Sequence, residues 1–321
     1  MDILLNIFYS ICGVAGLYYG AEFLVKGGVG IARKAGISPL VIGLTLVAFA
    51  TSAPELVVSV KASLSGNADI SLGNVVGSNI CNIALILGIC ACITPLAVQK
   101  QLLKFDTPIM IGASILLTIF YFSSKGLTRW QGLVLFAGFL AYTFWNIHAS
   151  RKNNAVKEEE KEEIAGENGK EMHIYSAVFL VICGLALLIA GAEFFLRSAV
   201  FFAKLFRLSD AVIGLTIVAV GTSLPELATS IVAACKKESD IAIGNVVGSN
   251  IFNILGILGI APIIAPMQNA TLDIVDLSMM LLTGILLLPM MFTGGKLSRK
   301  EGALLLVIYC GYIAYLLIQH T

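Results

Sequence analysis

The sequence predicts an all-α membrane protein of about ten transmembrane helices, arranged as two five-helix repeats of inverted topology. Three observations support this fold class. The 321 residues are 58% hydrophobic and only 13% charged, which is more apolar side chain than one soluble core can bury. Apolar runs of about 20 residues, the length that spans a bilayer, recur along the chain. The first half of the sequence also resembles the second half.

The apolar runs define the expected helices in order, because short clusters of charge, proline or glycine separate them. We expect spans over residues 3–25, 37–62, 70–95, 105–123, 128–149, 173–198, 209–234, 241–265, 274–293 and 301–319. The first run has no basic residues before it and no small-residue cleavage site after it. We therefore expect it to be retained as a span and not removed as a secretory signal.

The distribution of basic residues predicts the orientation. With ten spans, about fifteen of the 21 Lys and Arg residues fall on one side of the membrane, which is then the cytoplasmic side. Both termini should lie outside, in a multi-pass protein of a prokaryotic plasma (inner) membrane. The segment 150–172 carries the run KEEEKEE and should be a solvated cytoplasmic linker. It divides the chain into a first repeat at 1–149 and a second, inverted repeat at 173–321.

An internal repeat supports this division. Shifting the sequence by 171 positions aligns GLTLVAFATSAPELVVS (43–59) with GLTIVAVGTSLPELATS (214–230). The same shift aligns DISLGNVVGSNICNIALILGI (69–89) with DIAIGNVVGSNIFNILGILGI (240–260). About thirty of some fifty positions between 38 and 89 are identical to their partners, without a gap. Because each half has an odd number of spans, the second half should be inverted, as in secondary transporters that bind substrate where the repeats meet.

The repeated residues are polar and lie within apolar spans. Glu55 follows Pro54, and Glu226 follows Pro225 at the equivalent place. A proline inside a helix frees backbone carbonyl oxygens, which can then become ligands. Thr51 and Glu55 share a helical face, as do Asn74, Ser78 and Asn82, and the second half repeats this pattern.

A carboxylate at membrane depth costs at least about 2.5 kcal/mol, so it needs a cation, a proton or a basic partner. Within the spans that carry Glu55 and Glu226 the only Lys, Arg or His is Lys61, at the end of its span, and the three histidines flank span ends. Two carboxylates with hydroxyls, amides and freed carbonyls form an oxygen-rich cage that suits calcium, and sodium can use part of it. The sequence therefore predicts transported calcium and sodium, with no cofactor, nucleic acid or obligate protein partner.

Several other polar residues are more simply interpreted as structural. The seven cysteines lie in or beside apolar spans without CxxC spacing and should be small core residues. Single Ser, Thr and Gly residues often serve helix packing. Glu22 with Lys26, and Glu193 with Arg197, have the spacing of local ion pairs. Asp69 and Asp240 open their spans and are expected to be N-caps.

The motifs TSAPELVVS with GNVVGSNICNI, and TSLPELATS with GNVVGSNIFNI, resemble the two alpha repeats of the sodium/calcium exchangers, within the calcium:cation antiporter superfamily. The likeness covers nearly the whole chain and fits a prokaryotic two-repeat member. It implies that Glu55 and Glu226 are the central carboxylates and that Thr51 and Thr222 add oxygens to the calcium site. The resemblance further implies that sodium sites and the middle of the cage use Ala48, Ser52, Ser78 and Asn82, with Ala219, Ser223, Ser249 and Asn253.

The mechanism expected from these residues is exchange by competition. Two negative charges in an apolar surrounding need neutralising, so an empty carrier should cross slowly, and calcium and sodium should exclude one another. The first and sixth spans, which lack ligand motifs, would move against the other helices. The resemblance implies three sodium ions per calcium ion.

Three other functions need to be distinguished from sodium/calcium exchange. Some relatives have Asp where this chain has Asn253, which weakens the case for potassium co-transport. A proton-coupled or potassium-dependent antiporter of calcium or manganese nevertheless remains an alternative. A cation channel would need no counterflow. An enzyme is not expected, because the sequence has no HExxH or GxGD motif and no mid-membrane histidine.

Overall fold

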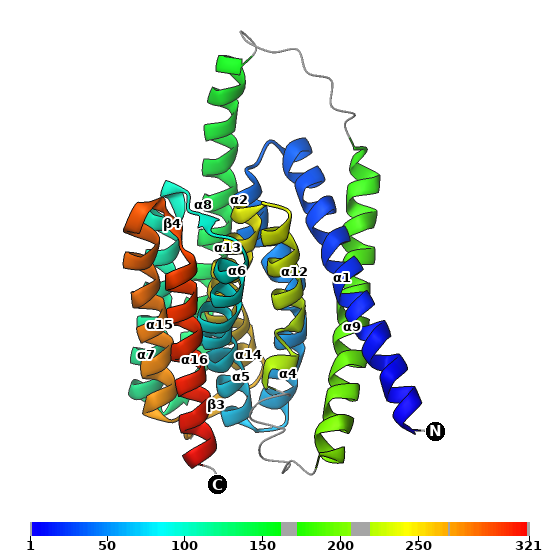
Figure 1. Cartoon of the computed structure of the whole chain (residues 1–321). Coiled ribbons are helices and arrows are strands. Elements are labelled where there is room, and N and C mark those ends of the chain that lie inside the picture. The colour runs from blue at the N-terminus through cyan, green and yellow to red at the C-terminus, as the bar shows by residue number, and fades with distance from the viewer. Residues whose placement is uncertain (1, 162–171, 207–218, 269, 320–321) are drawn as a thin grey trace.

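The computed structural model describes residues 2–161, 172–206, 219–268 and 270–319, and it is an all-helical membrane protein (Figure 1). Within these residues eight helices are long and apolar enough to cross a membrane, and a ninth candidate is a helix pair bent by 49° between Thr51 and Ala53. The expected span over 209–234 is represented by the shorter apolar helix Leu224–Cys235. The first part of that span, up to residue 218, lies outside the described residues.

The described α-helices of the two halves follow one another in a similar order. The α-helices of the first half are α1 (Asp2–Ala35), α2 (Pro39–Ile42), α3 (Ala48–Thr51), α4 (Ala53–Leu64), α5 (Ala68–Ile80), α6 (Gly88–Ile93), α7 (Thr107–Ser124) and α8 (Arg129–Lys161). Those of the second half are α9 (Ile174–Leu205), α11 (Ala219–Gly221), α12 (Leu224–Cys235), α13 (Ser239–Ile251), α14 (Leu258–Ile264), α15 (Ile274–Phe292) and α16 (Arg299–Gln319).

Wider and tighter helical turns, and short strands, join these helices. The π-helical segments are η1 (Gly43–Val47), η2 (Cys81–Leu87), η3 (Leu102–Asp106) and η5 (Phe252–Ile257), and η6 (Thr293–Gly295) is a 3₁₀ turn. The strands are β1 (Leu96–Ala97), β2 (Gly126–Leu127), β3 (Met267–Gln268) and β4 (Lys296–Leu297). The π-helical segments η2 and η5 interrupt equivalent places of the two halves, and such segments often mark functional sites.

Equivalent helices of the two halves run in opposite directions. In Figure 1, α5 lies at the lower end and leads up to α6, whereas α13 lies at the upper end and leads down to α14. The strands join the halves: β1 pairs with β4 and β2 pairs with β3, both antiparallel. The inverted repeat expected from the odd number of spans is therefore present in the fold.

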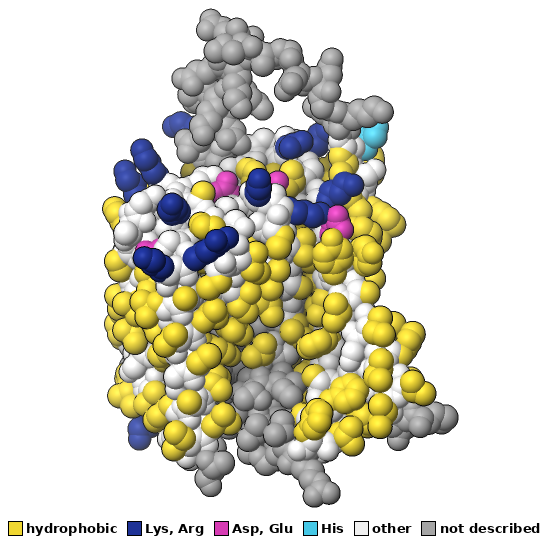
Figure 2. Space-filling model, viewed as in Figure 1, with side chains coloured by type: hydrophobic (Ala, Val, Ile, Leu, Met, Phe, Trp, Pro, Cys, Tyr) yellow, Lys and Arg dark blue, Asp and Glu magenta, His cyan; other side chains and the backbone are white. Residues whose placement is uncertain are grey.

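The centre of the molecule is formed by the two repeated motif helices. The most apolar stretch of the Ala68–Ile93 span is 72% buried and that of Ser239–Ile264 is 83% buried, against 17% for the first span. Figure 2 shows a broad belt of hydrophobic side chains around the outside, with most visible Lys and Arg side chains at one end. The belt fits contact with lipid, and the polar motif residues lie inside it.

Helices α1 and α9 form a separate, closely packed pair. The two helices meet glycine against glycine. A Cβ on Gly16 would lie only 3.0 Å from the Cα of Gly191. A Cβ on Gly20 would lie 2.8 Å from the carbonyl oxygen of Gly184. At these glycines the two backbones approach directly, as is common between membrane helices.

Four expectations about elements and side chains need correction. Helix α8 continues to Lys161 instead of ending near residue 149, because Glu and Lys are strong helix formers and extend the helix without an apolar face. Residues 162–171 of the expected linker lie outside the described residues. Cys81 and Cys90 are buried as expected, but Cys235 and Cys310 are exposed.

The expected local ion pair of Glu22 is also wrong. Lys236 reaches Glu22 Oε1 from α12 at 2.7 Å, so this bond joins the α1–α9 pair to the rest of the molecule. The Arg197 guanidinium lies over the ring of Tyr9, 5.4 Å from its centroid, in a cation–π contact. Long side chains can therefore bind partners on neighbouring helices, and sequence spacing does not reveal these partners.

Asp69 and Asp240 are not N-caps. Asp69 accepts hydrogen bonds from Thr271 N at 2.6 Å and Thr271 Oγ1 at 3.0 Å, while Asp240 accepts one from Gln99 Nε2 at 2.6 Å. Each acid therefore binds the segment that follows a strand of the opposite half. These bonds join the two halves at the ends of the motif helices.

The close contact of α1 with α9 predicts the effect of a single methyl group. We expect Gly20→Ala to destabilise the protein by about 1–3 kcal/mol, because the new Cβ would meet backbone atoms that cannot rotate away. Gly311→Ala is the matched control, since a Cβ there meets no atom within 4 Å. Thermal unfolding in detergent should show a lower midpoint for Gly20→Ala only. Equal midpoints for both variants would contradict the close backbone contact.

Candidate functional site

The site begins at a helix break that occurs in both halves. Ser52 has φ −84° and ψ 10°, and Ser223 has φ −86° and ψ 9°, so the helix stops and restarts at each serine. Pro54 and Pro225 lie in the first turn of the new helices α4 and α12, where a missing N–H costs little. Glu55 and Glu226 follow directly and are therefore presented at helix N-termini, which favour negative charge.

The two acids are buried and bonded to opposite halves of the molecule. Glu55 and Glu226 are each 1% exposed. Ser52 Oγ donates to Glu226 Oε1 at 2.7 Å, and Ser223 Oγ donates to Glu55 Oε1 at 3.2 Å. Each acid is thus held by the serine that precedes the other acid. Among the described residues neither acid has a basic partner, so hydroxyl groups alone compensate one oxygen of each carboxylate.

One asparagine binds the start of each acidic helix. Asn74 Nδ2 donates to the Glu55 carbonyl oxygen at 3.3 Å and to Ser59 Oγ at 3.0 Å. Asn245 Nδ2 makes the same two bonds to Glu226 at 3.4 Å and to Ser230 at 3.0 Å. The amide groups therefore fix the backbone on which the carboxylates stand. Such support keeps a site in one geometry.

The other predicted hydroxyl and carbonyl ligands differ in whether they already have a hydrogen-bond partner. Thr51 Oγ1 donates to Asn245 Oδ1 at 3.0 Å, whereas Thr222 Oγ1 has no hydrogen-bond partner. Ser223 Oγ lies 3.4 Å from Ser78 Oγ, and Ser249 Oγ is buried without a partner. The carbonyl oxygen of Ala48 accepts the N–H of Ser52, and Ala219 begins helix α11.

Among the predicted ligands that the structure describes, every buried side-chain atom without a hydrogen-bond partner is an oxygen. These atoms are Glu55 Oε2, Glu226 Oε2, Asn82 Oδ1, Asn253 Oδ1, Ser249 Oγ and Thr222 Oγ1. A buried oxygen without a donor costs about 1–3 kcal/mol, and more when it is charged. Hard cations are bound by such carboxylate, amide and hydroxyl oxygens. The donor set therefore fits calcium or sodium as the transported substrate, with two negative charges at its centre.

Two site-adjacent asparagines were not predicted from the sequence. Asn79 and Asn250 are each 1% exposed and lie between Asn82 and Asn253 at the contact of α5 with α13. The signal that could have found them is the doubled spacing SNxxN, which gives each motif a second amide three residues before the predicted one. The helical face predicted above consists of residues four apart, so it does not include the positions of Asn79 and Asn250.

A buried acid away from the cage was also missed. Asp106 is 0% exposed, and its Oδ1 accepts hydrogen bonds from Tyr142 OH at 2.9 Å and Asn146 Nδ2 at 3.0 Å. Asp276 accepts one from Tyr312 OH at 2.7 Å, so the acid–tyrosine pair occurs in both halves, 170 positions apart. This repetition favours a role in joining α7 to α8 and α15 to α16.

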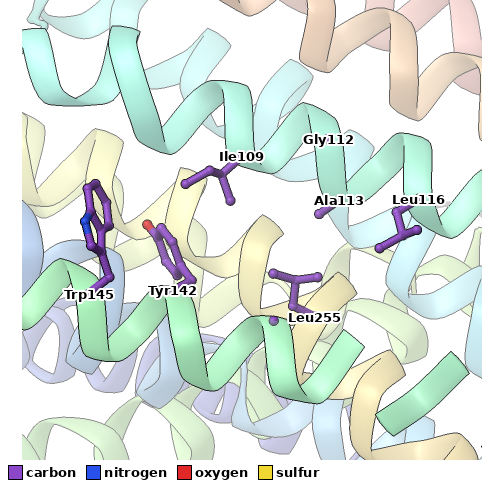
Figure 3. A pocket seen from close by; sticks show the side chains of 8 residues that line it. Ile109, Gly112, Ala113, Leu116, Tyr142, Trp145 and Leu255 are labelled. Atoms are coloured by element: carbon purple, nitrogen blue, oxygen red, sulfur yellow. The ribbon is translucent and has the colours of Figure 1, made fainter. Parts of the chain in front are cut away.

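Two cavities near these residues differ in whether a predicted ligand lines them. Figure 3 shows an apolar cavity of about 340 Å³ between α7 and α8, lined by side chains that include Ile109, Tyr142 and Leu255. None of the predicted ion ligands lines it. A second cavity, of about 630 Å³, lies between α9 and the helix breaks, and Pro54 and Thr222 line it. This second cavity reaches the residues beside both acids.

Removing the tyrosine hydroxyl should cost a different amount of stability in the two acid–tyrosine pairs. Tyr142→Phe should destabilise the protein by about 1–3 kcal/mol, because Asp106 is fully buried and loses a donor. Tyr312→Phe is the matched variant and should cost less, because Asp276 is only partly buried and water can replace the hydroxyl. Thermal unfolding midpoints in detergent measure both. A larger loss for Tyr312→Phe would contradict the assigned burial.

Comparison with known proteins agrees with this geometry. The family described as sodium/calcium exchanger protein matches residues 5–148 and 176–318. The sodium/calcium exchanger MaX1 of Methanosarcina acetivorans is 33% identical over 98% of this chain and 99% of its own length. The putative antiporter CaxA of Alkalimonas amylolytica is 38% identical over 95% and 96% of the two chains.

The solved structures give the same answer. A structure of the sodium-calcium exchanger NCX_Mj, soaked with zero Na⁺ and Ca²⁺, superimposes with a TM-score of 0.83 at 33% identity. The match covers 98% of this chain and 99% of that chain. The fold, the two matched regions and the full-length relatives together place the protein among membrane cation antiporters and not among enzymes. The chain belongs to the sodium/calcium exchanger family.

Proposed function

We propose that this protein exchanges calcium for sodium by alternating access, with Glu55 and Glu226 as the shared central ligands. One observation supports this proposal above the others. The two acids come from opposite halves, each is bonded to the serine beside the other, and each keeps one buried oxygen without a donor. A cation between the halves would satisfy both oxygens at once.

Charge competition explains the coupling. The two carboxylates supply two negative charges, which one calcium ion or more than one sodium ion can neutralise. Because the ions share oxygens, binding of one kind excludes the other. The empty site leaves two charges uncompensated in a low-dielectric interior, so the empty carrier is slow to change its conformation. Exchange is then obligatory instead of a leak. A ratio of three sodium ions per calcium ion is part of this proposal.

The remaining ligands follow the same two-fold pattern. In this proposal Thr51 and Thr222 add hydroxyl oxygens to the calcium site. Sodium ions use further hydroxyls and backbone carbonyls, and amide oxygens line the middle of the cage. These further groups belong to Ala48, Ser52, Ser78, Ala219, Ser223 and Ser249, with Asn82 and Asn253 as the amides. The unpartnered oxygens of Ser249, Asn82 and Asn253 support this assignment.

Alternating access requires one part of the protein to move against another. The α1–α9 pair is suited to move as a unit, because the two helices approach one another closely at their glycines. The cavity lined by Pro54, Glu193 and Thr222 lies between α9 and the site, and it would serve as the route to one side. Movement of the α1–α9 pair would close this route and open an equivalent one.

The orientation belongs to the same proposal. The basic side chains gathered at one end support a cytoplasmic location for that end, and in this proposal both termini and the cavity beside Thr222 lie on the outside. The two halves, 1–149 and 173–321, act as the inverted units around the site, and 150–172 connects them in the cytoplasm. With sodium more concentrated outside, the net direction would be export of calcium.

Flux in proteoliposomes tests the proposal. Calcium-45 uptake is measured with sodium, potassium or proton gradients for the wild type, Glu55→Gln and Glu226→Gln. We expect an outward sodium gradient to drive uptake in the wild type, and we expect either substitution to reduce it to the background, because a neutral amide leaves one negative charge to hold a divalent ion. Asp69→Asn is the matched control and should keep its uptake, because Asp69 is an exposed acid outside the cage.

The same experiment separates the alternative functions. Uptake driven by protons or dependent on potassium, but not by sodium, would favour the proton-coupled or potassium-dependent antiporter of calcium or manganese. Uptake that survives in both glutamine variants would remove the carboxylates from the mechanism. Calcium flux without any counter-gradient would indicate a channel.

A further inference from the structure

Four asparagine side chains form a closed set at the contact of the motif helices. Asn82 Nδ2 donates to Asn250 Oδ1 at 3.0 Å, and Asn253 Nδ2 donates to Asn79 Oδ1 at 3.0 Å. Asn250 Nδ2 lies 3.3 Å from the Asn79 carbonyl oxygen, and Asn79 Nδ2 lies 3.4 Å from the Asn250 carbonyl oxygen. Every one of these bonds joins α5 or η2 to α13 or η5, so each half orients the amides of the other.

The direction of each amide follows from one group that cannot change its role. A backbone carbonyl oxygen only accepts, so the side of Asn250 that faces the Asn79 carbonyl must be its NH₂ group. The sulfur of Met110 lies 3.6 Å from the same nitrogen and is also only an acceptor. The oxygen of Asn250 must therefore point the other way, toward Asn82.

The same argument passes to the next amide. Because Asn250 presents an oxygen, Asn82 must turn its NH₂ group toward it. This leaves Asn82 Oδ1 at the opposite end, buried and without a partner. In the other half the Asn250 carbonyl fixes Asn79, Asn79 fixes Asn253, and Asn253 Oδ1 is left buried without a partner.

We infer that Asn79 and Asn250 are positioning residues that keep the oxygens, and not the NH₂ groups, of Asn253 and Asn82 available to the transported cation. This inference rests on the proposed ion cage, in which Asn82 and Asn253 are ligands. An amide that turned over would direct two N–H donors at the cation and repel it. The lock thus supplies two neutral oxygens without adding charge to the two carboxylates.

A purely structural role predicts something different. Interhelical amide bonds also join membrane helices, and a structural loss would weaken the protein whichever cage residue is present. The lock instead predicts coupling along two particular pairs, Asn250 with Asn82 and Asn79 with Asn253. The members of each pair belong to opposite halves. Asn79 and Asn82, which are three residues apart on one helix, should not be coupled.

Double-mutant cycles on calcium affinity test this prediction, since they isolate the term that belongs to one pair. The calcium-45 concentration dependence of sodium-driven uptake gives KM and kcat for the full-length protein in proteoliposomes. We expect Asn250→Leu to raise the calcium KM at least about tenfold, the loss of one ligand of about 1.4 kcal/mol, with a smaller effect on kcat. In an Asn82→Ala background, which has no amide to orient, Asn250→Leu should have no further effect on KM.

The mirror pair and two mismatched pairs complete the design. Asn79→Leu should be non-additive with Asn253→Ala. The mismatched cycles, Asn250→Leu with Asn253→Ala and Asn79→Leu with Asn82→Ala, should be additive. Only variants that elute as single species with a wild-type unfolding midpoint enter the comparison, and Asn250→Ser and Asn79→Ser replace any leucine variant that does not fold.

Two results would separate the possible failures. If the wild type shows no sodium-driven calcium uptake, the proposed exchange itself is wrong. If the wild type exchanges but all four cycles are additive, or if Asn250→Leu leaves the calcium KM unchanged, the exchange stands and the orientation lock is wrong.

Discussion

Two buried carboxylates that face one another across an internal two-fold repeat are the constraint on which the rest of this molecule depends. An ionised acid in hydrocarbon costs at least about 2.5 kcal/mol on insertion scales, and two acids near one another add mutual repulsion. Serine hydroxyls bind one oxygen of Glu55 and one of Glu226, and no described basic residue pairs with either acid. The two acids therefore stay without a compensating positive charge from the described residues, and the proposed cation site rests on this arrangement.

The surrounding structure holds this unfavourable arrangement in place. The helix breaks at Ser52 and Ser223 present the acids at helix N-termini, and Asn74 and Asn245 bind the backbone behind them. Further hydrogen bonds join the two halves at the asparagine pairs and at the strand pairs β1–β4 and β2–β3. Because both halves contribute to every layer, neither half contains a complete site. The packed α1–α9 pair lies beside this core, and Lys236 binds it to the core through Glu22.

Much of this was predictable from the sequence, for identifiable physical reasons. Apolar runs of about 20 residues form helices in lipid, so composition and run length predict the fold class, and a gapless repeat brings Glu55 and Glu226 to equivalent positions. Contacts between distant segments were not predictable in the same way. Lys236 binds Glu22, and Asp69 and Asp240 bind residues of the opposite half. These partners are determined by how the helices pack and not by sequence spacing. Asn79 and Asn250 were missed because their role appears only when two motif helices meet.

The most direct test of the central claim is anomalous diffraction from crystals of this protein grown with calcium. The account predicts a peak between the two halves, with Glu55 Oε2 and Glu226 Oε2 both at about 2.3–2.6 Å from the ion. A peak bound by only one of these acids, or a site in which a basic side chain replaces the ion between them, would contradict it.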